Sequence, residues 1–406
     1  MQKLNILYLL ADHGHDLTLN QGFQVHVWQI LKNLEKLGHA PFLLTINEKK
    51  VLPDFARYET VAHLYFPLVH RLMPYTGMLD SLRVARAIRR RHATAKFDLI
   101  HERYGLYSFG GALAAKWLGI PYLLEVNAPA IEEKVLFGPP LTGAQRGVAR
   151  SITRINLKHC DAIITVSRFL KGKIVQAWNV RSEKVLVLTN AADSALFRLN
   201  GRHENHDSDG KSKKLVIGYL GTLQPWFGIE NLLYAFQIVS RHLPRARLQI
   251  IGDGMQRPAL EALAKRLKIK SKTTFVGSIP HTSVGRYLQG FDIAVAPYRP
   301  IITGFYGSSM KVFEYMAAGK AIVASHIGQL SEVLENRKTA MLVEPGETEE
   351  LAQAILRLAK NPRLRENLAV AARNIARQNY SWDQYAQKLE DIYKRILSTR
   401  NGSAGK

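Results

Sequence analysis

The amino-acid sequence predicts an α/β protein made of two doubly wound parallel-sheet domains. Buried strand-like runs alternate with helical segments along the chain, and the alternation restarts after a polar stretch at residues 199–214. The length of 406 residues also exceeds that of a typical single core. We therefore expect a first domain at 1–198, a linker at 199–214 and a second domain at 215–380. A terminal helix and tail, 381–406, should pack back toward the first domain.

The composition indicates which binding partners and which cellular compartment to expect for the protein. The formal charge of +23 predicts attraction to an anion: nucleic acid, acidic lipid or a phosphorylated substrate. Zinc-finger spacings and the aromatic RNA-binding signature are missing, so we expect no nucleic-acid partner. The single cysteine, Cys160, excludes an internal disulfide and a cysteine-based zinc site. With no run of about 18 uncharged apolar residues and no signal peptide, we expect a cytoplasmic protein.

The first half begins with a strand–helix–strand unit. A buried strand at 4–10 and a polar loop at 11–22 lead into an amphipathic helix that ends at Gly38, followed by a strand at 41–46. Further strands are expected at 61–66, 97–101, 122–126, 161–166 and 184–188. In such a sheet, ligands bind at the carboxyl ends of the strands.

The second half repeats this plan. We expect a strand at 215–220, a loop at 221–228, a helix at 229–242 and a strand at 247–251 followed by Gly252-Asp253-Gly254. Strands follow at 274–276, 292–296, 321–324 and 340–343, and the last helix at 382–397. Neither half has Gly-x-Gly-x-x-Gly at its first turn, which argues against a dehydrogenase.

The stretch from Phe305 to Gly319 is the main candidate site. It is typical of a small-residue loop entering a short helix near Ser309 that ends at Gly319. The backbone N–H groups at a helix start suit a phosphate or diphosphate. Glu314 lies about one turn inside that start, where it can accept hydrogen bonds from hydroxyls of the same ligand. This pattern indicates a nucleotide-sugar pocket, although an ordinary loop and helix of an α/β protein would look the same on this stretch alone.

Two helical segments carry basic stripes. Their arginines recur at spacings of three and four residues, which places them on one helix face. They are Arg83, Arg86 and Arg90 in the first stripe, and Arg146, Arg150 and Arg154 in the second. One interpretation is docking on the anionic headgroups of a membrane. The other is a pair of solvated basic faces, the more usual meaning of such runs.

Taken in order, several segments resemble the retaining glycosyltransferases of family 4, the glycosyl transferases group 1, which have the GT-B fold. This resemblance implies two Rossmann-like domains facing one another across a cleft. The segments are Gln21-Gly22, Leu37-Gly38-His39, Val166-Ser167, Asn190-Ala191-Ala192-Asp193, Gly218-Tyr219-Leu220-Gly221, Ile251-Gly252-Asp253-Gly254 and the stretch around Glu314.

The resemblance implies transfer of a sugar from a nucleoside-diphosphate sugar to a hydroxyl of a saccharide or lipid-linked acceptor in cell-envelope or exopolysaccharide synthesis. A UDP-sugar is favoured over a GDP-sugar, and neither a metal nor another cofactor is expected. Glu314 would bind the ribose, Gly277 would lie near the base, and Gly22 would lie near the donor phosphates or the acceptor. The other expected donor-binding residues are Gly221, Thr222, Gly252, Tyr306, Gly307, Ser308, Ser309, Met310 and Lys311.

The sequence also departs from the family pattern. Tyr306 stands where the family has a first glutamate, and the positions of its diphosphate-binding basic pair fall near Thr222 and Phe227. Lys311 is the candidate substitute cation; alternatively it is a surface lysine. Asn127 replaces a histidine, so it can bind a sugar hydroxyl but cannot shuttle a proton.

The predicted catalytic residues are therefore Glu314, Lys311 and Asn127. Two other readings remain open at this point: a non-catalytic GT-B partner protein that binds a nucleotide or glycan, and a sugar-nucleotide epimerase of the same fold.

Overall fold

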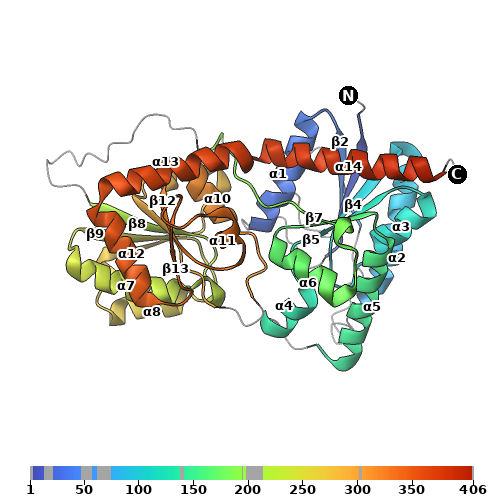
Figure 1. The fold of residues 1–406 in the computed structure, drawn as a ribbon. Helices are drawn as coiled ribbons and strands as arrows, with labels where there is room; N and C mark the ends of the chain where they lie inside the picture. Colours follow the sequence, from blue (N-terminus) through green and yellow to red (C-terminus); the bar gives the residue numbers. More distant parts are fainter. Residues whose placement is uncertain are drawn as a thin grey trace. The chain divides into compact units, whose positions relative to one another are not determined.

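The computed structural model describes residues 3–12, 22–46, 57–61, 75–137, 141–193, 195–197, 214–300 and 304–404. The chain divides into two compact units, Met1–Thr189 with Asp383–Lys406 (unit 1) and Asn190–Trp382 (unit 2) (Figure 1). Almost all of the predicted linker, the predicted strand at 61–66 except its first residue, and Gln21 lie outside the described residues.

Unit 1 contains a parallel sheet of seven strands in the order β3-β2-β1-β4-β5-β6-β7. The strands are β1 (Asn5–Leu10), β2 (Ala40–Thr45), β3 (Tyr58–Thr60), β4 (Leu99–Arg103), β5 (Tyr122–Val126), β6 (Ala162–Thr165) and β7 (Val185–Val187). Every residue of β2, β4 and β5 is buried. Such continuous burial is typical of a parallel sheet covered on both faces.

The helices of unit 1 are α1 (Gly22–Lys36), α2 (Tyr75–Ala95), α3 (Gly110–Leu118), α4 (Ala130–Phe137), α5 (Gly143–His159), α6 (Arg168–Trp178) and α14 (Trp382–Ala404). Helix α5 begins at a capping box between Thr142 and Gln145. Helix α14 continues beyond the predicted 382–397. It contributes Tyr393, whose hydroxyl lies 2.7 Å from Nδ1 of His101 on β4.

Unit 2 contains a parallel sheet of six strands in the order β10-β9-β8-β11-β12-β13. The strands are β8 (Leu215–Leu220), β9 (Ala246–Ile251), β10 (Thr273–Gly277), β11 (Ile293–Ala296), β12 (Ala321–Ser325) and β13 (Met341–Val343). In both sheets the chain starts at a central strand, moves to one edge and then returns to fill the other. This order confirms the predicted doubly wound α/β class.

Two layers of helices cover the sheet of unit 2. Alternate strand residues point to opposite faces, so Ile293 and Val295 pack in one core cluster while Ala294 and Ala296 pack in the other. The first cluster contains residues of α7 (Ile229–His242), α8 (Arg257–Arg266) and α12 (Thr348–Lys360). The second contains residues of α9 (Val284–Gln289), α10 (Met310–Ala317), α11 (Gly328–Val333) and α13 (Pro362–Asn379).

Candidate functional site

The start of α10 in unit 2 is fixed by contacts from outside its own helix. Ser309 holds the N-cap position, but its side chain makes no capping bond and accepts a hydrogen bond from the Tyr298 hydroxyl at 2.7 Å. The preceding loop is tied to Asn190, whose Nδ2 donates to the Ser308 carbonyl at 2.9 Å and whose backbone N–H donates to Ser308 Oγ at 3.1 Å. The loop is thus held in place while the amides of the first turn lack a side-chain cap from Ser309.

Glu314 lies in the second turn of α10 with its side chain only 7% exposed. His281 Nε2, from the short 3-10 helix η5 (His281–Ser283), lies 2.9 Å from Glu314 Oε1. Within the described ranges, no other side chain hydrogen-bonds to this carboxylate. It can therefore still accept hydrogen bonds from a bound ligand. The sequence analysis missed His281, because nothing local marks a histidine that reaches a helix so far along the chain.

Lys311 is buried, so the interpretation as a surface lysine is wrong. The residue is 8% exposed, and its Nζ donates a hydrogen bond to the Tyr219 hydroxyl at 3.0 Å. Nζ also lies 4.1 Å from the ring centroid of Phe227, 4.5 Å from that of Tyr219 and 5.2 Å from that of Tyr298. These three rings form an aromatic box around the amine. Burial lowers the pKa of Lys311 to about 7, although the nearby charge of Glu314 acts in the opposite direction.

Three predicted glycines meet where β8, β9 and β10 end. The backbone N–H of Gly221 donates to the Ile251 carbonyl at 2.9 Å, and that of Gly252 donates to the Gly277 carbonyl at 2.8 Å. Gly252 has φ of +130°, and a Cβ there would lie 1.9 Å from the Gly221 carbonyl oxygen. A larger residue at 252 would therefore clash with backbone.

Gly221 connects these turns to α10. A Cβ on Gly221 would lie 2.7 Å from Lys311 Nζ, so the aromatic box opens directly onto the backbone of this turn. The carbonyl of Thr222, the next residue, accepts a hydrogen bond from the Tyr219 hydroxyl at 2.9 Å. The structure thus brings Gly221, Thr222 and Lys311 together. Tyr306, where a glutamate was expected, is buried at 9% exposure.

Arg257, at the start of α8, is a further cation beside these turns that the sequence analysis did not single out. Its Nη1 lies 2.7 Å from Asp253 Oδ2 and its Nε lies 3.0 Å from Glu261 Oε1. A Cβ on Gly277 would lie 3.1 Å from the same Nη1. The i, i+4 spacing on either side of Arg257 could have suggested these pairs.

Unit 1 has its own polar centre at Glu125, near the carboxyl end of β5. The side chain of Glu125 is 1% exposed. Burial opposes its ionisation, but neighbouring His26, His101 and Arg103 outweigh burial and hold the pKa of Glu125 well below its usual range. Its contacts are Arg103 Nη1 at 2.7 Å, His26 Nε2 at 2.9 Å, the Tyr8 hydroxyl at 3.0 Å, His101 Nε2 at 3.1 Å and Asn127 Nδ2.

Asn127 is positioned by this centre. Its Nδ2 donates to Glu125 Oε1, which fixes the orientation of the amide, and its Oδ1 is buried without a hydrogen-bond partner among the described residues. Asn127 Oδ1 can therefore accept a hydrogen bond from a ligand donor, such as a hydroxyl group. Gly22 is the first residue of α1, the helix that supplies His26 to the same centre. Asn127 and Gly22 thus belong to unit 1, whereas the other predicted site residues belong to unit 2.

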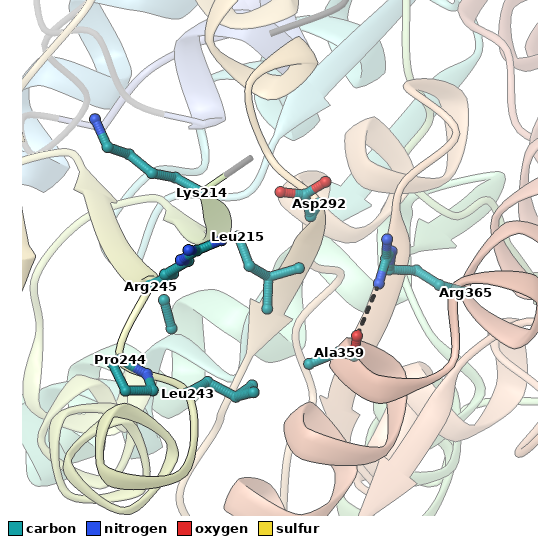
Figure 2. Close-up of a pocket in the computed structure, with 9 residues that line it drawn as sticks. Lys214, Leu215, Leu243, Pro244, Arg245, Asp292, Ala359 and Arg365 are labelled. Carbon is teal, nitrogen blue, oxygen red and sulfur yellow. Dashed lines mark hydrogen bonds between the residues drawn. The ribbon is translucent and has the colours of Figure 1, made fainter. Parts of the chain in front are cut away.

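A cavity of about 410 Å³ lies at the opposite edge of the second sheet, where β8, β9 and β11 begin (Figure 2). It combines an apolar floor with basic side chains and one aspartate, and Arg365 donates to the Ala359 carbonyl at 3.4 Å. Its lining residues are Lys214, Leu215, Leu243, Pro244, Arg245, Ala246, Asp292, Ala359 and Arg365. This cavity lies at the amino ends of the strands, whereas ligands of α/β sheets bind at the carboxyl ends, and it shares no lining residue with the α10 site.

The two basic stripes differ in how far their charges are paired. In the α2 stripe, Arg83 lies 3.7 Å from Asp80 and Arg90 lies 2.6 Å from Glu59. In the α5 stripe, Arg146, Arg150 and Arg154 are all exposed. None of these three has a carboxylate within 4 Å in the described part of the chain.

Membrane-spanning helices and metal-binding clusters are both absent among the described residues. None of the helices there is both long and apolar enough to cross a membrane. Nor do those residues include a group of three or more histidine, cysteine, aspartate or glutamate side chains arranged to hold a metal ion.

Two family models match successive parts of the chain. A glycosyl transferase 4-like domain matches residues 21–191, and glycosyl transferases group 1 matches residues 214–361. The chain belongs to the group 1, or family 4, glycosyltransferases. It is accordingly a transferase.

Similar proteins share this assignment. An uncharacterized glycosyltransferase of Methanocaldococcus jannaschii is 24% identical over 92% of this chain and 94% of its own length. A D-inositol 3-phosphate glycosyltransferase of Kribbella flavida is 23% identical over 93% of this chain and 91% of its own.

Solved structures agree in fold. A sucrose-phosphate synthase from Thermosynechococcus elongatus superposes with a TM-score of 0.74 at 19% identity, covering 98% of this chain and all of that one, 100%. Anabaena Alr3699/HepE, solved in complex with UDP and glucose, gives 0.73 at 18% identity, covering 96% and 99%. These likenesses confirm the predicted GT-B fold of two Rossmann-like domains.

Proposed function

We propose that this glycosyltransferase uses a UDP-sugar as its donor and binds it in unit 2, at the start of α10. The observation that carries the proposal is the pairing of a fixed, side-chain-uncapped helix start with a carboxylate one turn further in. Glu314 then accepts hydrogen bonds from the ribose, and the amides of Ser308 to Met310 hold the diphosphate. The complexes of Anabaena HepE with UDP and with UDP-glucose support UDP over GDP.

The turns at Gly221, Gly252 and Gly277 form the rest of the proposed donor site. They meet through backbone hydrogen bonds at the carboxyl edge of the sheet, the edge at which ligands bind in α/β folds. In this proposal the nucleotide base lies near Gly277 and the guanidinium of Arg257.

The proposed reaction retains the configuration of the sugar. The bond between the anomeric carbon and the diphosphate oxygen breaks, and the acceptor oxygen bonds to that carbon on the same face. The acceptor's proton passes to the leaving diphosphate, so the protein needs no separate base. Its main task is to stabilise the negative charge on the diphosphate, through helix amides and the ammonium of Lys311, without a metal.

In this proposal Asn127 binds a sugar hydroxyl and takes no part in proton transfer. Its Oδ1 is buried without a described partner, and Glu125 holds the amide so that this oxygen stays an acceptor. The hydroxyl group of a bound sugar would satisfy it.

Release of nucleoside diphosphate from UDP-, GDP- and ADP-sugars, with and without membrane extract as a source of acceptor, tests the donor. We expect turnover with a UDP-sugar, raised by the extract and unaffected by EDTA. Thermal shifts with free UDP, GDP and ADP should rank UDP first. Turnover confined to GDP-sugars, or lost in EDTA, contradicts the proposal.

We further propose that the acceptor is a saccharide or lipid-linked saccharide of cell-envelope or exopolysaccharide synthesis, and that unit 1 docks peripherally on an anionic membrane surface. The exposed arginines of α5 support this, because they lie beside Ile155, an apolar side chain that is 41% exposed.

Sedimentation with vesicles containing anionic lipid tests the docking. The variant R146A/R150A/R154A should lose binding that the wild type shows at low salt, because it removes three charges from one face. A matched control, R357A/K360A/R363A, removes three exposed charges from unit 2 and should bind as the wild type does. Equal binding by both variants contradicts membrane docking through α5.

A further inference from the structure

The aromatic box gives Lys311 an environment with two opposed effects. The faces of Tyr219, Phe227 and Tyr298 attract a cation, with the nearest ring centroid 4.1 Å from Nζ. Burial, however, removes the water that would otherwise solvate an ammonium. Nζ has one hydrogen-bond partner in the described part of the chain, the Tyr219 hydroxyl, and no described carboxylate lies within 4.0 Å of it. The box accommodates the amine in either protonation state.

The groups around the box do not supply a fixed counter-charge. Burial raises the pKa of Tyr219 and Tyr298, so both hydroxyls stay neutral near pH 7. Tyr315, on the same helix, also has a raised pKa because it is buried, and its hydroxyl accepts a hydrogen bond from the Leu220 N–H at 2.8 Å. The carboxylate whose charge acts on Lys311 is that of Glu314, one turn along α10, and it already contacts His281. With burial lowering the pKa of Lys311 to about 7, both protonation states are populated near neutral pH.

The box also opens toward the proposed donor. Lys311 lies in the first turn of α10, and the missing side chain at Gly221 leaves Nζ against the backbone of the β8 turn. A diphosphate held at the helix start therefore brings its negative charges close to this amine. An adjacent anion favours the charged form of a base.

We propose that binding of the donor diphosphate is coupled to uptake of one proton by Lys311. In the free protein, part of the population holds a neutral amine in the aromatic box. When a nucleoside diphosphate binds, the amine takes a proton from solvent and becomes an ammonium, and that proton returns to solvent when the nucleotide leaves. The Lys311 ammonium is therefore present when negative charge develops on the leaving diphosphate. This inference rests on the proposed donor site.

Calorimetric titration with UDP in two buffers of different ionisation enthalpy, PIPES and imidazole, measures the protons taken up. We expect wild type to exceed K311M by about 0.7 proton at pH 7.5 and by about 0.1 proton at pH 6, because the free amine is already protonated at the lower pH. K311R should bind UDP with no such uptake, since a guanidinium stays charged. Methionine suits an apolar box, so K311M should fold, which its melting curve checks.

His281 is the histidine in contact with Glu314, so H281N is the matched control. Uptake that persists in K311M or K311R, or that disappears in H281N alone, overturns the inference and leaves the donor proposal standing. If K311M does not bind UDP, the comparison is made between wild type and K311R, and proton uptake equal to that of wild type in K311R overturns the inference. If UDP fails to bind wild type, the donor proposal fails, and this inference fails with it.

Discussion

Each unit buries an ionisable side chain near the carboxyl edge of its sheet, but the two are satisfied in different ways. Glu125 of unit 1 lies within 3.1 Å of two histidines and an arginine, so its charge is balanced inside the protein. Lys311 of unit 2 has aromatic rings and one hydroxyl around it. The first is the pattern of a structural centre, because its charge is already paired. The second is the pattern of a site that a ligand's charge completes.

The largest expected effect in this comparison is on unit 1. E125A leaves His26, His101 and Arg103 without their shared carboxylate, which should lower the free energy of unfolding by about 3–5 kcal/mol. Urea denaturation measures it. E183A removes an exposed glutamate of the same unit and should change stability by less than about 0.5 kcal/mol. A loss below about 1 kcal/mol in E125A would show that the centre is not structural.

The pH dependence of stability should have the same sign for the two groups but fall in different pH windows, because both folded pKa values are lowered. The folded pKa of Glu125 is lowered, so its contribution is present above its ordinary value of 4.5 and is lost as pH falls through the folded pKa. The folded pKa of Lys311, about 7, lies below its ordinary 10.5, so the unfolded chain binds more protons between these values.

Stability attributable to Lys311 should therefore rise as pH rises from 7 to 10, by about 3 kcal/mol. The measurement is the difference in unfolding free energy between wild type and K311M across that range. A difference that does not change with pH contradicts the lowered pKa.

A smaller effect, on the rate of sugar transfer, should come from removing Lys311 and placing a lysine at position 227. K311M should slow transfer by about 10–100-fold, since a charge-assisted contact to the diphosphate is worth about 1.5–3 kcal/mol. The resemblance implies a basic residue near Phe227, and the Phe227 ring already lies 4.1 Å from Lys311 Nζ. F227K in the K311M background should recover part of the rate. Initial rates with a UDP-sugar measure both, and a double variant no faster than K311M would count against the exchange.

The sequence allowed the fold and the start of α10 to be predicted because both depend on local patterns. Helical and strand periodicities are local, and so is the glycine at position 319 that follows α10. The place of Glu314 one turn inside the helix start was also a local pattern, and the resemblance supplied the donor-binding role of the glycine turns. The environment of Lys311 could not be predicted in this way, because its box combines Tyr219 of β8, Phe227 of the turn after β8 and Tyr298, which follows β11.

The centre at Glu125 was missed for the same physical reason. His26, His101 and Arg103 are unremarked residues in a helix and a strand, and only the pairing of β4 with β5 and the packing of α1 bring them to one carboxylate. His281 reaches Glu314 across a similar gap in sequence. Long-range contacts of this kind leave no periodic signal in the chain.

UDP binding to wild type, E314A and E366A tests the central claim most directly. Glu366 is an exposed glutamate of α13, so E366A controls for the loss of one negative charge in unit 2. We expect E314A to keep its fold but bind UDP at least about 10-fold more weakly, because it loses charge-assisted hydrogen bonds to the ribose. E366A should bind as the wild type does. Equal UDP affinity in E314A and wild type would contradict a donor site at the start of α10.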